Sequence, residues 1–316
     1  MHYVENMAYV GDRPWHGLGS RLNKDQSIET WKTAAGMDWA INEAEVEYRS
    51  ASCGESDTHG YPEQKVLYRS DTLTPLAVVS KRYQVVQPEE VLEFYRDLTS
   101  LHGFELETAG VLKGGRKFWA LARTGQSETL SKQDRVDGYL LLATACDGTL
   151  ATTAQFTSVR VVCNNTLQIA VGEKAGAVKV PHRSQFRPEV VKEQLGITVA
   201  GWDVFAKNMR LLCETPVDPD SVDGLLRRVL TYGATGESVV NERAVAHVRA
   251  LYEGGGRGSL LKSSKGTAWG VLNSVTEFVD HHRRARSDDH RRDAAWFGEG
   301  QVIKRRAWDE AVRLIG

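Results

Sequence analysis

The 316-residue sequence is poor in cysteine, and its four cysteines are widely spaced: Cys53, Cys146, Cys163 and Cys213. None of them forms a C-x-x-C pair, so the sequence indicates neither a disulfide framework nor a zinc site. It lacks any run of 18 apolar residues, which excludes a membrane-spanning helix. Its first residues lack the basic and apolar regions of a secretory signal. We therefore expect a soluble intracellular protein with reduced thiols.

Sequence motifs of several enzyme classes are also missing. There is no G-x-S-x-G nucleophile elbow. The glycine loop at residues 254–266, "GGGRGSLLKSSKG", does not match the phosphate-binding pattern G-x-x-x-x-G-K-[ST]. We expect this loop to be mobile, although its basic residues could wrap a polyanion. Cys163 beside Asn164 suggests either a thiol nucleophile or a cysteine buried at a strand end. We expect no catalytic centre and no cofactor.

Charge is unevenly distributed along the chain, although the formal net charge is only -1. Residues 1–150 contain 16 basic and 22 acidic residues, a net of -6, and residues 151–316 contain 24 and 19, a net of +5. This asymmetry indicates either a basic face in the second half or ordinary scatter.

Hydrophobic periodicity changes along the chain from that of strands to that of helices. Alternation predicts a strand over residues 39–49, a polar connector over 51–64, and two strands around the "SDTLTP" turn. Glycines at 114–115 and the Asp147-Gly148 pair predict two hairpins. From Phe186 onward the apolar residues repeat at helical spacing. We predict an α+β fold, with an antiparallel, β-hairpin-rich core over 1–185 and a mostly helical region over 186–316 packed on it.

The stretch "TSVRVVCNNTLQIA", residues 157–170, is predicted to be a strand that stops at an asparagine pair and turns into a helix. Asn164 and Asn165 are good helix N-caps, which is one explanation of the pair. The other is that Arg160, Asn164 and Asn165 project from the sheet end. There the arginine would grip phosphate and the amides would pair with base edges.

A second candidate site is the hairpin tip "LKGGRKFWALAR". Lys113, Arg116 and Lys117 gather there, and Trp119 or its neighbour Phe118 could stack on a base. Because successive strand residues point to opposite faces, we expect only one of the two rings in the core. The alternative is a solvated tip with one core aromatic.

The third candidate is the segment "DHHRRARSDDHRRDAAW", which is rich in arginine and histidine. Its arginines include Arg283, Arg284, Arg291 and Arg292, which would contact phosphate. A metal site built from His281, His282, His290 and Asp280 is a competing interpretation, although the arginines are poor neighbours for a divalent ion. A solvated helix end with an Asp280–Arg284 ion pair is a third.

Four stretches carry a resemblance to a known family: "RPWHGLG", "AGVLKGGRKFWALA", "DGTLATTAQFTSVRVVCNNTL" and "TAWGVLNSVTEFVDHHR". Together they resemble the phage/plasmid-like protein family, a domain of unknown function. The resemblance implies an origin in mobile elements and a bacterial cytoplasmic setting. A weaker analogy links the hairpin and helix order of residues 104–170 to phage single-strand annealing proteins, which oligomerise and hold single-stranded DNA in a basic groove.

Three hypotheses follow for the function. The first is a DNA-binding protein of mobile elements that binds or anneals single strands and forms homo-oligomers, without a membrane partner. The second is a metal-dependent nuclease or phosphohydrolase that uses the 280–290 cluster. The third is a phage-encoded adaptor or inhibitor that binds a host protein.

Overall fold

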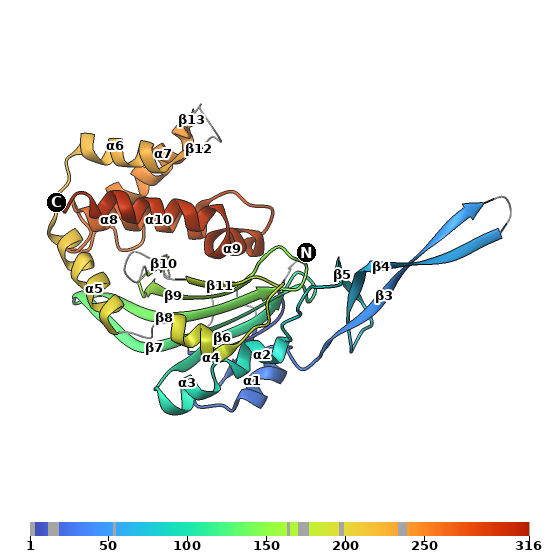
Figure 1. Ribbon diagram of the computed structural model, residues 1–316. Coiled ribbons are helices and arrows are strands. Elements are labelled where there is room, and N and C mark those ends of the chain that lie inside the picture. The colour runs from blue at the N-terminus through green and yellow to red at the C-terminus, as the bar shows by residue number, and fades with distance from the viewer. Residues whose placement is uncertain are drawn as a thin grey trace. The chain divides into compact units, whose positions relative to one another are not determined.

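The computed structural model describes residues 4–11, 19–52, 55–162, 165–169, 177–195, 199–232 and 239–315 (Figure 1). Strands concentrate in the N-terminal and central parts and helices in the C-terminal part, which confirms the α+β class. The chain forms two compact units. The first comprises residues 1–124, 140–155 and 177–197, and the second comprises 125–139, 156–176 and 198–316. These units do not coincide with the expected segments 1–185 and 186–316, because three long strands contribute to both.

Among the described residues, one sheet has eight strands in the order β10-β9-β8-β7-β6-β1-β2, with β11 also paired to β9. Its strands are β1 (Val4–Val10), β2 (Ser20–Leu22), β6 (Glu105–Leu112), β7 (Lys117–Ser131), β8 (Asp134–Ala145), β9 (Thr152–Arg160), β10 (Asn165–Gln168) and β11 (Ala177–Val180). The predicted hairpins are confirmed: Gly114 and Gly115 lie between β6 and β7, and Gly148 lies between β8 and β9, all at positive φ.

Short helices complete the first unit: α1 (Ile28–Ala34), α2 (Pro88–Glu93), α3 (Arg96–Leu101) and α4 (Pro188–Leu195). Helix α1 begins after Ser27, whose side chain accepts a hydrogen bond from the Thr30 amide at 3.2 Å. Helix α2 begins at a proline, and Gln87 and Glu90 form a capping box in front of it. Each helix turns apolar residues inward, such as Trp31 of α1 and Leu92 of α2.

A second sheet of three strands also belongs to the first unit: β3 (Ile41–Ser52), β4 (Glu55–Arg69) and β5 (Pro75–Ser80). The predicted turn at residues 70–75 is confirmed, but the connector expected over 51–64 is wrong, because most of it is strand β4. β4 pairs with β5 only over Gln64–Tyr68, and the remainder of β3 and β4 forms a two-stranded ribbon (Figure 1). Its Thr, Tyr and His side chains suit a strand even though the stretch looks like a polar loop.

The expected helix after the asparagine pair is also wrong. Asn165 opens strand β10, which pairs antiparallel with β9, so that Asn165 lies opposite Arg160. Along β10, buried and half-buried residues alternate, which is the periodicity of a strand with two unequal faces. Asn164 and Cys163 lie outside the described residues, as does "RPWHGLG" apart from its last glycine.

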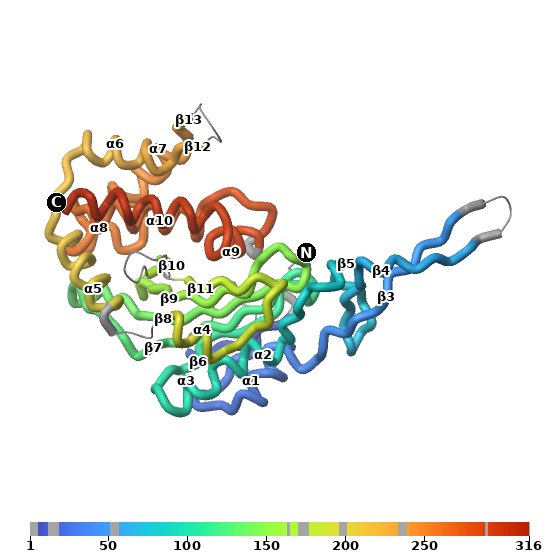
Figure 2. The backbone as a smooth tube through the Cα atoms, in the orientation of Figure 1, coloured from blue at the N-terminus to red at the C-terminus, as the bar shows by residue number. Residues whose placement is uncertain are grey.

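The C-terminal part of the chain is mainly helical, as predicted, and its residues 198–316 belong to the second unit. It contains α5 (Val199–Glu214), α6 (Pro219–Val229), α7 (Glu242–Ala250), α8 (Ala268–Glu277), α9 (Asp288–Phe297) and α10 (Glu299–Val312). It also contains two π-helical turns, η1 (Leu251–Gly255) and η2 (Phe278–His282), and the short strands β12 (Thr231–Tyr232) and β13 (Val239–Val240). Every residue of α8 is buried, so this helix is the core of the unit, where it packs on β10, α5 and α10 (Figure 2). None of the described helices is long and apolar enough to cross a membrane.

Candidate functional site

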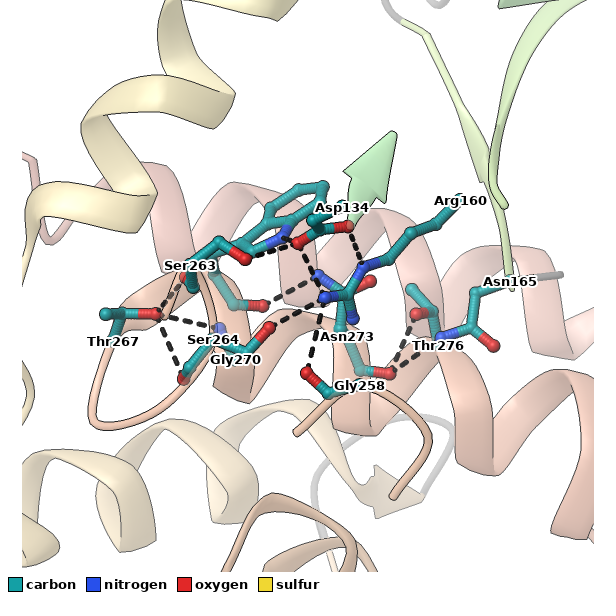
Figure 3. Close-up of polar contacts among 11 residues, drawn as sticks. Asp134, Arg160, Asn165, Gly258, Ser263, Ser264, Thr267, Gly270, Asn273 and Thr276 are labelled. Carbon is teal, nitrogen blue, oxygen red and sulfur yellow. Dashed lines mark hydrogen bonds and ion pairs between the residues drawn. The ribbon is translucent and has the colours of Figure 1, made fainter. Parts of the chain in front are cut away.

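Arg160 is not a surface residue but one half of a buried ion pair in the second unit (Figure 3). Its Nε donates to Asp134 Oδ1 and its Nη2 donates to Asp134 Oδ2, both at 2.7 Å. The two residues stand at the end of β9 and the start of β8, which are neighbours in the sheet. Because both are almost fully buried, each charge depends on the other to offset its loss of hydration.

The glycine loop supplies the remaining partners of this pair. Ser263 donates its hydroxyl to Asp134 Oδ2 at 2.5 Å, and Ser264 Oγ accepts from Arg160 Nη2 at 2.7 Å. Trp269, in the first turn of α8, donates its indole N–H to Asp134 Oδ2 at 3.3 Å. These contacts tie the second half of the loop at 254–266 to the buried charges, which its glycine content alone did not indicate.

The electrostatics of Asp134 follow from these contacts. Burial alone would raise the pKa of its carboxyl. The Arg160 charge, its hydrogen bonds and those of Ser263 and Trp269 more than offset that effect, so the pKa lies below its ordinary value. Asp134 is thus ionised at neutral pH and cannot act as a general base with a raised pKa. The cluster fits a structural clamp better than a catalytic site.

Asn165 completes the buried cluster. Its Nδ2 donates to the Asn273 carbonyl of α8 at 3.1 Å, whereas its Oδ1 is the buried side-chain polar atom that has no partner among the described residues. The void that Asn165 lines with Arg160 and Thr276 is about 10 Å³, roughly the room that one water molecule needs. No ligand larger than that fits here. The expectation that Arg160 and Asn165 project toward nucleic acid is therefore corrected, since both side chains are inside the protein.

The hairpin tip in the first unit is also less open than its sequence suggests. Arg116 is exposed and Lys113 half-exposed, but Lys117 is 2% exposed. Phe118 and Trp119 are both buried, which corrects the expectation that only one ring is in the core. Trp39 packs on Phe118, with ring centroids 5.5 Å apart, and Gly110 leaves room for the Trp119 ring on the other face. Neither ring is available to stack on a base.

The position of Asp280 argues against the interpretation of this segment as a metal site. This carboxylate pairs with Lys304 of α10 at 2.7 Å and also accepts the Thr166 amide of β10 at 2.7 Å, and both charged side chains are buried. It does not pair with Arg284, because η2 ends at His282 and Arg283, at φ -57° and ψ 129°, leaves the helical conformation. No group of three His, Cys, Asp or Glu side chains that could hold a metal, His281, His282 and His290 included, is found in the described parts of the chain.

The described cysteines do not support a thiol enzyme either. Burial raises the pKa of both Cys146 and Cys213 to about 12. Both are therefore protonated at neutral pH and poor nucleophiles. Cys163 lies outside the described residues, so its role as a thiol nucleophile is not tested.

A second site, which we call the basic cavity, lies on the surface of the second unit. Its volume is about 560 Å³, and its lining residues come from β12, from α7 with its capping residue, and from η2 with the residues after it: Tyr232, Asn241, Arg243, Ala244, His247, Phe278, His282, Arg283 and Arg284. Three arginines and two histidines thus meet beside two aromatic rings. Among these described lining residues there is no carboxylate.

Local structure explains how this cavity is built. Asn241 caps α7 by accepting the Ala244 amide at 3.0 Å, and Arg243 and His247, four residues apart, share one face of that helix. Opposite them, the π-turn of η2 ends with the Arg283 amide donating to the Phe278 carbonyl at 2.7 Å. The His247 ring lies 5.4 Å from Phe278 and 5.1 Å from His282. Such π-helical turns frequently occur at functional sites, where they re-aim side chains.

The structure places some of the arginines predicted in the 283–292 segment in the cavity and others on α9. Arg283 lines the cavity and pairs with Glu299, whereas Arg284 is exposed. No described carboxylate forms an ion pair with Arg243 or Arg284. Arg291 and Arg292 lie on α9, and Arg291 donates its Nε to the Arg283 carbonyl at 2.8 Å, which fixes the position of Arg283. Two of the four predicted arginines therefore reach the cavity directly.

A comparison with protein-family models matches residues 75–296 to DUF932, a domain of unknown function. The match covers more than two thirds of the chain. The chain belongs to the DUF932 family. The DUF932 match includes the Asp134–Arg160 clamp and every residue of the basic cavity, but it excludes β3 and β4. A search of curated proteins finds no similar sequence.

Several residues of the cavity gave no local signal in the sequence. Arg243 and His247 occupy the polar face of an ordinary amphipathic helix, and Tyr232 sits on a two-residue strand. A spacing of four residues between Arg243 and His247 was visible, but it is common in solvated helices. Asp134 likewise stands alone in a polar stretch, so only tertiary structure pairs it with Arg160.

Proposed function

We propose that this DUF932 protein binds single-stranded nucleic acid through the basic cavity. The observation that carries the proposal is the convergence of Arg243, Arg283 and Arg284 with two histidines and two aromatic rings around one hollow. Phosphate needs cationic donors, and a guanidinium can grip it with two parallel hydrogen bonds. Arg243 and Arg284, which form no ion pair with a described carboxylate, are the ones best placed to do so.

The aromatic residues of the cavity favour a single strand over a duplex. Single-strand binders combine cations for the backbone with flat rings on which bases stack, and each stack contributes about 1–3 kcal/mol. Tyr232, which is half-buried, is placed beside the arginines in this way, whereas Phe278 is 8% exposed and packs against His247 in the cavity wall. A volume of about 560 Å³ suits one or two nucleotides and is within the usual range of binding cavities.

The wider setting of the proposal comes from the sequence resemblance to phage/plasmid-like proteins. In that setting, single-strand binding or annealing would serve recombination or replication of a mobile element in the bacterial cytoplasm. The binding residues differ from those expected at the sheet end and hairpin tip. The nuclease hypothesis is not carried forward, because Asp280 is already bound to Lys304.

The experiment is fluorescence anisotropy with a labelled single-stranded oligonucleotide over a range of salt concentrations. We expect Arg243→Ala/Arg284→Ala to weaken binding at least about tenfold and to lower the salt slope by about 0.7 for each phosphate that is no longer neutralised. Arg187→Ala is the matched control, because Arg187 is equally exposed but lies in the first unit, and it should leave binding unchanged.

Two results would refute the proposal. One is the absence of salt-sensitive binding by the wild-type protein. The other is an equal loss of affinity in the cavity variant and in the Arg187 control, because a general charge effect would then explain the binding without the cavity.

A further inference from the structure

The ribbon formed by β3 and β4 in the first unit has no structural partner among the described residues along its outer part. Residues pair across it from Glu47 and Gly60 outward to Ser52 and Glu55, a length of roughly 20 Å. No third described strand pairs with this stretch, and Tyr48 is 54% exposed. An isolated two-stranded ribbon is marginally stable in water. The described side chains at 47–50 and 57–60 are exposed or half-exposed, which is typical of an arm that binds another surface.

Charge on this arm is strongly one-sided. We define the acidic ribbon as residues 45–50 and 57–63, which contain the carboxylates of Glu45, Glu47, Asp57 and Glu63 and the guanidinium of Arg49. None of these four carboxylates forms an ion pair with a described residue. Strand alternation over residues 47–49 places Glu47 and Arg49 on one face and Tyr48 on the other, where its ring centroid lies 5.3 Å from that of His59.

We propose that the acidic ribbon of one copy of this chain docks in the basic cavity of a second copy. The two surfaces are complementary: the ribbon presents carboxylates and the cavity presents guanidinium groups, with no carboxylate among the cavity's described lining residues. Arginine and carboxylate groups form strong two-pronged pairs, and such complementarity selects one partner surface over others.

This contact joins two different surfaces, so two copies can make it twice about a two-fold axis, or successive copies can make it head to tail. Repetition of a head-to-tail contact gives a closed ring or an open filament. The inference rests on the proposed function in one respect, since the ribbon would compete with a nucleic-acid strand for Arg243 and Arg284. Polynucleotide binding would then release the arm, and assembly and binding would be coupled through one cavity.

A charge-swap experiment on the full chain tests this docking. Sedimentation velocity at low salt over a concentration series measures self-association. We expect Glu45→Lys/Glu47→Lys to raise the dissociation constant of self-association about tenfold or more. Adding Arg243→Glu/Arg284→Glu to that variant should restore association, because the pairs re-form with reversed signs. The substituted carboxylates are exposed, so folding should not change.

The control variant is Glu189→Lys/Glu193→Lys, which makes the same change of net charge on the exposed face of α4 and should leave association intact. The proposal is overturned if the wild type is monomeric at every concentration, if the control dissociates as much as the ribbon variant, or if the swap does not restore association. Chemical cross-linking that joins the ribbon only to residues of its own chain would overturn the proposal as well. Binding of the ribbon to a different protein instead of a second copy would also overturn it. The ribbon variant should bind oligonucleotide at least as well as the wild type, so failure of docking is distinguishable from failure of the proposed function.

Discussion

Arg160 and Asp134 pair through two hydrogen bonds of 2.7 Å inside the protein, and three side chains of the glycine loop and α8 converge on the same pair. The arginine that looked like a phosphate ligand is thus the centre of a clamp. It ties the ends of β8 and β9 to residues more than a hundred positions further along the chain.

The clamp predicts that breaking the buried ion pair lowers the free energy of unfolding much more than breaking an exposed ion pair. Arg160→Met should lower the free energy of unfolding by about 3–5 kcal/mol, because it leaves the Asp134 charge buried and unpaired. Arg96→Met is the control, since Arg96 pairs with Glu93 and Glu29 on the surface and should cost less than about 1 kcal/mol. Urea unfolding followed by circular dichroism measures both. Equal costs would show that the buried pair does not act as a clamp.

Lowering the pH should reduce the folding stability that the clamp provides. The pKa of Asp134 is lower in the folded protein than in the unfolded chain, so the unfolded chain binds the proton first and stability falls as pH falls. The loss should begin near the ordinary Asp pKa of about 4 and continue below it. We expect the stability gap between wild type and Asp134→Asn to be widest at pH 7 and to narrow toward pH 3. If urea titrations gave the same stability gap at every pH in this range, the assignment of a lowered pKa to Asp134 would be contradicted.

Gly270 gives a test of the contact between α8 and the glycine loop. A Cβ atom at this position would lie 1.9 Å from the Ser264 carbonyl oxygen, and that oxygen belongs to backbone that cannot rotate away. Gly270→Ala should therefore destabilise the protein by at least about 1–3 kcal/mol, although Gly→Ala in a helix normally stabilises by up to about 1 kcal/mol.

Gly224→Ala in α6 is the matched control for that substitution. Its Cβ would meet only the Arg228 Nη1 atom at 3.2 Å, at the end of a flexible side chain. It should be neutral or stabilising in thermal unfolding. If Gly270→Ala behaved like Gly224→Ala, the loop would not be held against α8 as the structure has it.

The sequence predicted the fold where local signals were strong. The α+β class, the two hairpins at glycine turns and the helical C-terminal part all depend on neighbours in sequence, and the structure confirms them. The first part of strand β4 was missed because its residues are mostly polar and look like a loop, whereas its last residues, 65–69, were predicted as the strand before the "SDTLTP" turn. The helix expected after Asn165 was wrong because Asn165 bonds to Asn273, more than a hundred residues away.

The candidate site was harder to predict for the same physical reason. Lys117, Arg160 and Asp280 have the side chains of binding residues, yet each is buried, and Arg160 and Asp280 are paired with charges distant in sequence. Arg283 and Arg284 were predicted, and they do reach the basic cavity. Their partners Arg243 and Tyr232 come from other elements, so only the folded unit brings the cavity together.

Photo-cross-linking of a single-stranded oligonucleotide that carries 5-iodo-deoxyuridine tests the central claim most directly, because this base reacts with aromatic rings on which it stacks. Peptide mapping by mass spectrometry then locates the adducts. The basic cavity predicts adducts at Tyr232 that disappear in Arg243→Ala/Arg284→Ala. Adducts confined to other parts of the chain, such as the hairpin tip at residues 113–116, would contradict it.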